Sequence, residues 1–159
     1  MKKTGTYFIS AMVALFFLLP LNSCSKDNKQ NQNNQSISEE IKTISSTNEL
    51  KSLLENSDKL LIFDLYADWC LPCKILSPIF SSLAKEQKSN AEFYRINVDK
   101  SPELSYSFGV RGIPYVVFVK NREIVYSLTG VNPKESYEKV INSCGDATNE
   151  LCMERLKDL

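Results

Sequence analysis

Two cysteines, Cys70 and Cys73, are separated by two residues and lie between an apolar run and a segment with helical periodicity. A thiol at the start of a helix is favoured as the thiolate by unpaired backbone N–H groups and by the helix dipole. The thiolate is the form that attacks a disulfide, and a second thiol one helical turn later can complete the exchange. The spacing therefore predicts thiol–disulfide exchange, with Cys70 as the catalytic nucleophile and Cys73 as the resolving thiol of a redox disulfide.

Asp64 is the only charged residue in the apolar run Leu60–Tyr66. Burial raises the pKa of a carboxyl group, because the charged form loses its hydration. A carboxylate tuned in this way can accept the proton of Cys73 through water and speed release of the partner. We therefore predict that Asp64 is a catalytic proton acceptor. The alternative is a carboxylate satisfied by hydrogen bonds and without a chemical role.

The elements that would position these side chains alternate between helix and strand. Apolar runs predict strands, and apolar residues at helical spacing after capping residues predict helices. Their order predicts an α/β fold, a central mixed sheet with helices on both faces, its first strands parallel and its last two antiparallel. The predicted strands are 60–66, 91–98, 115–119 and 123–128, and the predicted helices begin near Ser46, Cys70, Ser101 and Asn132.

The helix that carries the cysteines is expected to run from Cys70 to about Lys88. Its apolar residues recur at helical spacing, which predicts one apolar face, and a proline inside it predicts a kink. The sequence also predicts two turns outside this helix. Asn121-Arg122 joins the last two strands, and Gly145 caps the last helix. The apolar positions are Ile75, Leu76, Ile79, Phe80 and Leu83, and the proline is Pro78.

Several residues around the cysteine pair resemble the thioredoxin family. They are Trp69-Cys70-Leu71-Pro72-Cys73-Lys74, together with Asp64, Pro78 and Gly112-Ile113-Pro114, and the match extends from about Leu60 to Tyr137. The resemblance implies a thioredoxin fold, thiol–disulfide oxidoreductase activity without a cofactor, and the role given above to Asp64.

The resemblance also implies where substrates bind. It indicates a cis Ile113–Pro114 bond facing the cysteines, with Ile113 offering backbone groups to an extended substrate segment. A trans proline that merely opens the next strand is the alternative. Trp69 and Tyr66 either form an apolar rim or belong to a half-buried core. The predicted substrate-binding residues are Trp69, Leu71, Pro72, Ile113 and Pro114.

The sequence departs from the family pattern at two positions near the site. Leu71 replaces the glycine that is usual between the cysteines, and Arg95 stands where the family carries a lysine near the acid. Arginine keeps its charge, so it should favour the ionised form of Asp64. No histidine lies in the motif to stabilise Cys70 further, and strong oxidants of this fold depend on a greatly stabilised reduced form. We therefore expect a reductant or an isomerase-like enzyme rather than a strong oxidant.

Composition excludes several other classes of protein. The 159 residues carry 19 basic and 19 acidic side chains and no histidine. A balanced charge gives no reason to expect a nucleic-acid partner. Without histidine there is no Ser-His or Cys-His catalysis and no His-ligated zinc, and the cysteine spacing is not that of a zinc site. We expect no metal and a monomer.

Residues 1–23 are predicted to be a lipoprotein signal peptide. Lys2 and Lys3 precede a short apolar stretch, and Leu21-Asn22-Ser23-Cys24 resembles a bacterial lipoprotein signal, which implies lipid on Cys24. An uncut signal anchor, or an ordinary signal peptide with a spare cysteine, is the alternative. Residues 25–36 contain no apolar side chain, and residues 24–40 are therefore predicted to be a flexible tether to the folded domain, 41–145.

Residues 146–159 predict an added helical tail with Leu151 and Leu156 on its apolar side. Cys144 and Cys152 flank a possible helix reversal at Gly145 and could form a structural disulfide, as is usual for exported proteins. A second redox relay or two free thiols are the alternatives.

Taken together, the sequence predicts a lipid-anchored thiol–disulfide oxidoreductase whose domain faces the periplasm or extracytoplasmic space of a bacterium. Its substrates would be disulfides of exported proteins, and family analogy implies a transmembrane electron donor. Two other functions remain open: a partner-binding module with an idle disulfide, and a carrier of a soft metal ion such as copper(I) on Cys70 and Cys73.

Overall fold

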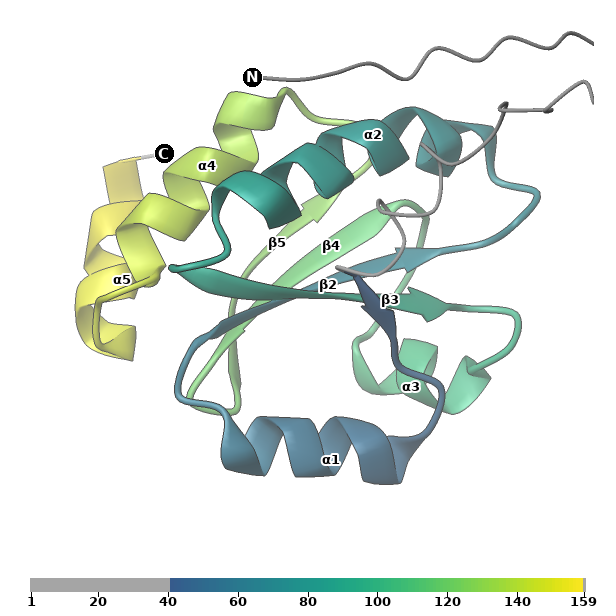
Figure 1. Cartoon of the computed structure of the whole chain (residues 1–159), viewed down its shortest axis with the longest axis horizontal. Coiled ribbons are helices and arrows are strands. Elements are labelled where there is room, and N and C mark those ends of the chain that lie inside the picture. Colours follow the sequence, from purple (N-terminus) through teal and green to yellow (C-terminus); the bar gives the residue numbers. More distant parts are fainter. Residues whose placement is uncertain (1–40, 159) are drawn as a thin grey trace, which may run out of the picture. The chain divides into compact units, whose positions relative to one another are not determined.

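A five-stranded mixed sheet forms the centre of the structure, a computed structural model that describes residues 41–158 (Figure 1). The strand order is β1-β3-β2-β4-β5; β1, β3 and β2 run parallel, and β4 and β5 are each antiparallel to the preceding neighbour. This arrangement confirms the predicted sheet. The strands are β1 (Lys42–Thr43), β2 (Leu60–Tyr66), β3 (Ala91–Asn97), β4 (Tyr115–Lys120) and β5 (Glu123–Thr129). The two-residue edge strand β1 was not predicted.

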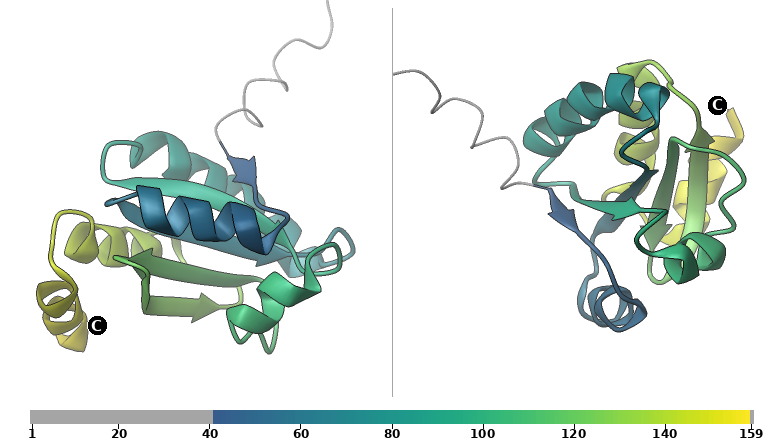
Figure 2. Two further views of the ribbon diagram at one scale, coloured as in Figure 1. Left: turned by 90° about the horizontal axis from the view of Figure 1, so that it is seen from below. Right: turned by 90° about the vertical axis from the view of Figure 1, so that its right-hand side faces the viewer.

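Helices cover both faces of the sheet, as predicted (Figures 1 and 2). One face packs against α2 (Leu71–Glu86) and α4 (Lys134–Cys144), and the other packs against α1 (Thr47–Asn56) and α3 (Pro102–Ser107). The described residues end with α5 (Asn149–Arg155) and a short 3₁₀ turn, Leu156–Asp158. The predictions for the signal peptide, for Cys24 and for the tether 24–40 lie outside the described residues. Within 41–158 no helix has both the length and the apolar character needed to cross a bilayer.

Strand β2 lies at the centre of the sheet and is buried on both faces. Its side chains alternate between the two faces, as the pleat requires. Leu60 and Ile62 join the core beneath α2 and α4, whereas Leu61 and Phe63 join the core beneath α1 and α3. By the same alternation Asp64 points to the α2 side. The strand thus directs its one charged side chain toward the helix that carries the cysteines.

The strand directions bring three segments to one edge of the sheet. Because β2 and β3 are parallel, their carboxyl ends coincide, and Tyr66 pairs with Asn97. Because β4 is antiparallel to β2, its first residue, Tyr115, pairs with Leu65 at the same edge. The residues just after β2 and just before β4, including Pro114, therefore meet there although they are far apart in sequence.

Both turn predictions are confirmed. Asn121 and Arg122 join β4 to β5 with positive φ angles of 50° and 69°, the conformation that a tight hairpin requires. Gly145 is the C-cap of α4, as predicted, with a right-handed backbone conformation (φ −56°, ψ −45°). Its N–H donates to the carbonyl of Ile141 at 2.7 Å, which closes the last turn of the helix.

The tail after α4 is fastened to the domain by a disulfide between Cys144 and Cys152. Both cysteines are fully buried in the core beneath α2 and α4, together with Leu156. Polar contacts add to the attachment, since the Asn149 side chain donates to the carbonyl of Lys120 at 3.2 Å. Leu151, which was predicted on the apolar side of the tail, is exposed instead. Leu156 takes the inward position because Cys152, four residues earlier on the same side, is already buried.

Replacing Cys144 and Cys152 together with alanine is expected to lower the free energy of unfolding by about 2–3 kcal/mol. The cysteines are eight residues apart, and closing a loop of that size restricts the unfolded chain by about this amount. Urea denaturation of the oxidised proteins measures the difference. Excess dithiothreitol reduces the disulfide of the wild type. The difference in free energy of unfolding should then shrink to the effect of replacing two buried cysteine side chains by the smaller alanine. Equal stability of the two oxidised proteins would contradict a structural role for the bond.

Candidate active site

Cys70 and Cys73 form a disulfide at the amino end of α2. The helix was predicted to begin at Cys70, but its first residue is Leu71 and Cys70 is the N-cap. In that position the Sγ of Cys70 accepts a hydrogen bond from the backbone N–H of Cys73 at 3.2 Å. Unpaired N–H groups at a helix start stabilise negative charge. Once the disulfide is reduced, the same N–H is available to a thiolate on Cys70.

Both sulfur-bearing residues are recessed, because Cys70 and Cys73 are only 3% and 4% exposed. They pack with Ala67, and Tyr66 and Ile113 lie against this small cluster. The Ile113–Pro114 peptide bond is cis, as predicted. Pro114 is buried, whereas Ile113 is half-buried beside the cysteines. The structure therefore brings the loop before β4 to the cysteine pair.

Asp64 is fully buried on β2. Burial raises the pKa of its carboxyl group to about 6, and the nearby charge of Arg95 opposes that rise. Oδ2 of Asp64 lies 3.2 Å from Nε of Arg95. The alignment of this contact does not meet hydrogen-bond geometry, and among the described residues neither carboxylate oxygen accepts a hydrogen bond. A buried carboxylate without hydrogen bonds is poorly stabilised as the anion, so the effect of burial exceeds that of the ion pair.

Arg95 is held in place by contacts on three sides. It is the neighbour of Asp64 in the pairing of β2 with β3. Its Nη2 donates to Oγ of Ser77 at 2.8 Å. Its guanidinium carbon lies 5.3 Å from the ring centre of Tyr66 and 5.8 Å from that of Phe80, both within the range of cation–π attraction. These contacts fix the guanidinium beside the acid rather than in open solvent.

A cavity of about 140 Å³ lies between Cys73 and Arg95. It is large enough for water molecules, and it has polar groups to bind them. Water in it would contact both Cys73 and the guanidinium next to Asp64. A larger cavity, of about 380 Å³, lies at the edge of β3, and no cysteine lines it. The smaller cavity is lined by Tyr66, Ala67, Asp68, Cys73, Lys74, Ser77 and Arg95.

The approach to the sulfurs is apolar. Trp69 is 68% exposed and Leu71 is 70% exposed, and Pro72 is exposed as well. The indole N–H of Trp69 donates to Oδ2 of Asp99 at 2.8 Å, which holds the ring at the edge of the site. Trp69 thus belongs to the rim, whereas Tyr66 lies half-buried beneath Arg95. The sequence left open whether Trp69 and Tyr66 form an apolar rim or a half-buried core; the first applies to Trp69 and the second to Tyr66.

Two residues of the site were not identified from the sequence, and one apolar position of α2 was misplaced. Ser77 binds Arg95 and Asp99 binds Trp69, as described above. Ile75 was placed on the single apolar face of α2 but is 60% exposed. For Ser77 a signal existed, since it lies one helical turn after Cys73. Within residues 41–158 no three cysteine, aspartate or glutamate side chains lie close enough together to hold a metal ion.

The comparisons with known proteins agree with this geometry. The family model for Thioredoxin matches residues 40–143. Thioredoxin H4 of Arabidopsis thaliana is 37% identical over 94 residues, which cover 59% of this chain and 79% of that protein. The thioredoxin of Listeria monocytogenes is 35% identical over 88 residues, covering 55% and 85%.

Solved thioredoxins have the same fold. A mutant thioredoxin from Halobacterium salinarum superposes with a TM-score of 0.63 and 29% identity, covering 69% of this chain and 94% of that one. Oxidised mitochondrial thioredoxin 3 of Saccharomyces cerevisiae gives a TM-score of 0.61 and 28% identity, covering 67% and 97%. Since the family model spans well over half of the sequence and the cysteine pair sits at the start of α2, the chain belongs to the thioredoxin family and is a thiol–disulfide oxidoreductase.

Proposed function

We propose that the chain reduces or isomerises disulfides of exported proteins in a bacterial cell envelope, held to a membrane by lipid on Cys24. The observation that carries the direction of electron flow is the limited stabilisation available to Cys70. Its Sγ accepts one backbone N–H, from Cys73, and the chain has no histidine to add a positive charge. A strong oxidant needs a far better stabilised thiolate.

The reaction proceeds in two exchanges. The thiolate of Cys70 attacks one sulfur of a substrate disulfide; that S–S bond breaks, a mixed disulfide forms, and the other substrate sulfur leaves as a thiolate that takes up a proton. Cys73 then loses its proton, attacks Cys70, and releases the second substrate sulfur as a thiolate. Two electrons pass to the substrate, and the Cys70–Cys73 disulfide remains. The cycle closes when an external dithiol, which we propose is carried by a membrane protein, reduces that disulfide.

Asp64 and the cavity beside Arg95 suit the second exchange. Cys73 lines the cavity together with Arg95, and Arg95 contacts the acid. Water in the cavity would carry the proton of Cys73 toward Asp64, whose raised pKa makes it a proton acceptor near neutral pH. In this proposal Arg95 is a positioning residue, because it acts on the acid and not on the substrate.

The proposed location has two supports. The sequence Leu21-Asn22-Ser23-Cys24 resembles a lipoprotein signal. The buried disulfide between Cys144 and Cys152 is typical of proteins that fold in an oxidising compartment. Two acyl signals or more are needed for stable anchoring, which a multiply acylated cysteine supplies.

One experiment in bacterial cells tests the location and the direction together. Cells that express the full chain are quenched with acid, alkylated, and partitioned between detergent and water. We expect the chain in the detergent phase, with Cys70 and Cys73 mostly as the dithiol. The Cys24→Ser variant should move to the aqueous phase. A wild-type chain found in the aqueous phase would contradict the anchor, and a fully oxidised pair would contradict the reductant role.

A further inference from the structure

The first two turns of α2 carry exposed apolar side chains in addition to the buried ones. The buried face is formed by Leu76, Phe80 and Leu83, spaced four and three residues apart. Leu71 and Ile75, also four residues apart, are 70% and 60% exposed. Residues at that spacing lie on the same side of a helix. The fold does not require this second apolar face, because packing against the sheet uses only the first.

The exposed apolar side chains are continuous with the reactive sulfur. Cys70 is almost completely buried, while its two chain neighbours, Trp69 and Leu71, are largely exposed. A disulfide that approaches Cys70 must therefore contact one or both of them. Ile75 extends the surface by one helical turn beyond Leu71, along the outside of α2. We call Leu71 and Ile75 the α2 strip.

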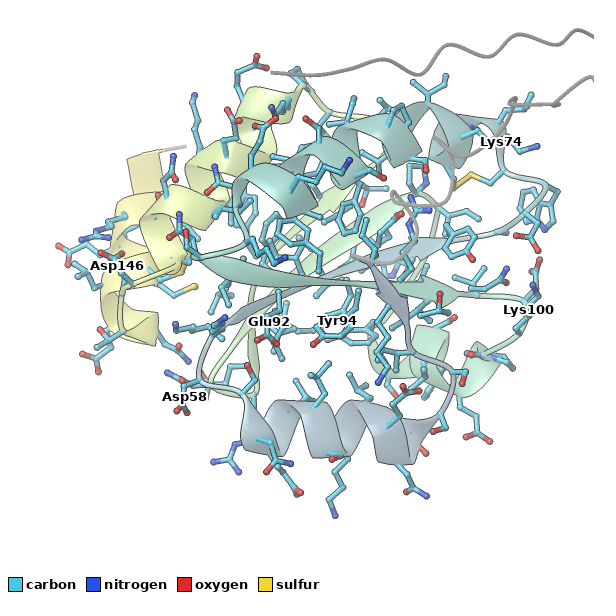
Figure 3. The ribbon with its side chains drawn as sticks, viewed as in Figure 1. Asp58, Lys74, Glu92, Tyr94, Lys100 and Asp146 are labelled. Carbon is cyan, nitrogen blue, oxygen red and sulfur yellow. A yellow bond between two sulfur atoms is a disulfide. The ribbon has the colours of Figure 1, made fainter. Side chains whose placement is uncertain are left out.

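The charged side chains around the α2 strip differ in their partners. Asp68 pairs with Lys100 at 3.1 Å, and Asp99 accepts the indole N–H of Trp69. Lys74 lies between the two residues of the strip in sequence, next to the disulfide (Figure 3). Among residues 41–158 no carboxylate forms an ion pair with it. Lys74 lies within the strip, between Leu71 and Ile75, and has no ion pair among the described residues, whereas Asp68 is paired with Lys100. An apolar segment that binds the strip is therefore favoured when it carries a negative charge next to Lys74.

The chain's own polar segment does not match this surface. Residues 25–36 contain no apolar side chain, so they offer nothing to bury against Leu71 and Ile75. The tail is also remote, since Asp146 lies at the opposite side of the domain from Lys74 (Figure 3). A substrate segment is therefore the better occupant.

We propose that the α2 strip selects substrates in which apolar residues and an acidic residue flank the reactive cysteine, with Ile75 as a specificity-determining residue. This inference rests on the proposed reduction of protein disulfides. Apolar side chains of the substrate would bury Leu71 and Ile75 while the substrate sulfur meets Cys70, and the acid would pair with Lys74. The strip contributes to docking and takes no part in the sulfur exchange.

Single-turnover kinetics with synthetic peptides test the proposal. Each peptide carries one cysteine in a disulfide with thionitrobenzoate, so that attack of the reduced full chain on the peptide sulfur releases a coloured thiol. One peptide has leucine and glutamate beside the cysteine, a second has serine and glutamate, and a third has leucine and lysine. The wild type should react about tenfold faster with the first than with the second, the effect expected of one well-packed apolar contact.

The variants separate docking from reactivity. Ile75→Ser should bring the leucine-to-serine rate ratio close to one without slowing the serine peptide. The wild type should also react faster with the first peptide, which carries glutamate, than with the third, which carries lysine. Lys74→Glu should reverse this preference. Met153→Ser is the matched control, because Met153 is an apolar residue of α5 that is 50% exposed; its ratios should equal those of the wild type.

Each remaining outcome has a defined meaning. If the wild type reacts equally with the first and second peptides, or if Ile75→Ser keeps the wild-type ratio, the docking role of the strip is wrong while the reductant role stands. If the wild type reacts with none of the peptides, the proposed reduction itself fails. If sedimentation shows a wild-type dimer that Ile75→Ser abolishes, a second copy covers the strip and the substrate proposal is overturned.

Discussion

Replacing Cys73 with serine is expected to arrest the enzyme as a mixed disulfide with its substrate, and replacing Cys70 with serine is expected to reduce activity to the uncatalysed rate. In the first variant Cys70 still attacks, but no second thiol is present to release the substrate. In the second variant the attacking sulfur itself is missing. Insulin reduction with dithiothreitol measures both losses. Mass spectrometry of the trapped Cys73→Ser species identifies the substrate and shows which cysteine of the enzyme is bound to it.

The same pair of variants separates the enzyme from a binding module. A module that only holds partners would keep its cellular function in the Cys70→Ser variant, whereas the enzyme would lose it. The Cys144→Ala/Cys152→Ala variant is the control for general damage, because it removes a disulfide remote from the partner-binding surface. Covalent capture by Cys70→Ser, or turnover by Cys73→Ser at the wild-type rate, would contradict the assigned order of attack.

The parts of this site that the sequence predicts are those with a local physical cause. An apolar run followed by two cysteines at the start of a helix is visible without a structure, and so is a charge inside a strand that must be buried. The β2 strand illustrates this, because its continuous apolar character already predicts burial on both faces. The α2 helix was predicted with its amino end one residue early, since a cap is fixed by backbone angles and not by composition.

The parts that could not be predicted depend on contacts between distant segments. Strand β1 has two residues and exists only because it pairs with β3 at the sheet edge. The exposure of Ile75 is another case, because five apolar positions on α2 fit one broad stripe and only the packed structure shows which of them touch the sheet. Likewise, the position of Ser77 one turn after Cys73 places it near the site, but its contact with Arg95 joins a helix to a strand, and the sequence does not show that partner.

Asp64→Asn is expected to stabilise the protein at neutral pH by about 3 kcal/mol. Burial raises the pKa of Asp64 from 3.8 to about 6, and each unit of difference between the folded and unfolded states is about 1.4 kcal/mol. The folded state keeps the proton between these two values while the unfolded state has lost it. Stability therefore falls as the pH rises from about 4 to about 6, and the cost is fully present above that range. Asparagine carries no charge and avoids this cost.

Urea denaturation from pH 4 to pH 8 measures the prediction. The gain of Asp64→Asn over the wild type should be largest at pH 7–8 and should be mostly lost by about pH 4, where the wild-type carboxyl group is protonated in the folded state and about half protonated in the unfolded state. Asp58→Asn is the control, since Asp58 is exposed and its replacement should leave the pH profile unchanged. A gain that grows toward low pH would mean that Arg95 outweighs burial and that the pKa of Asp64 is lowered instead.

The same variant should be slower as an enzyme, and the two effects together identify why a buried acid is present. If Asp64 accepts the proton of Cys73, Asp64→Asn should slow release of the mixed disulfide by up to about 10²-fold at neutral pH. The loss should fade below pH 6, where the wild-type acid is itself protonated. First attack by Cys70, followed under single-turnover conditions, should change little. A protein that is more stable and equally fast would show that the carboxylate has no chemical role. A protein that is more stable and slower would show that the charge in β2 is kept for catalysis at the expense of the fold.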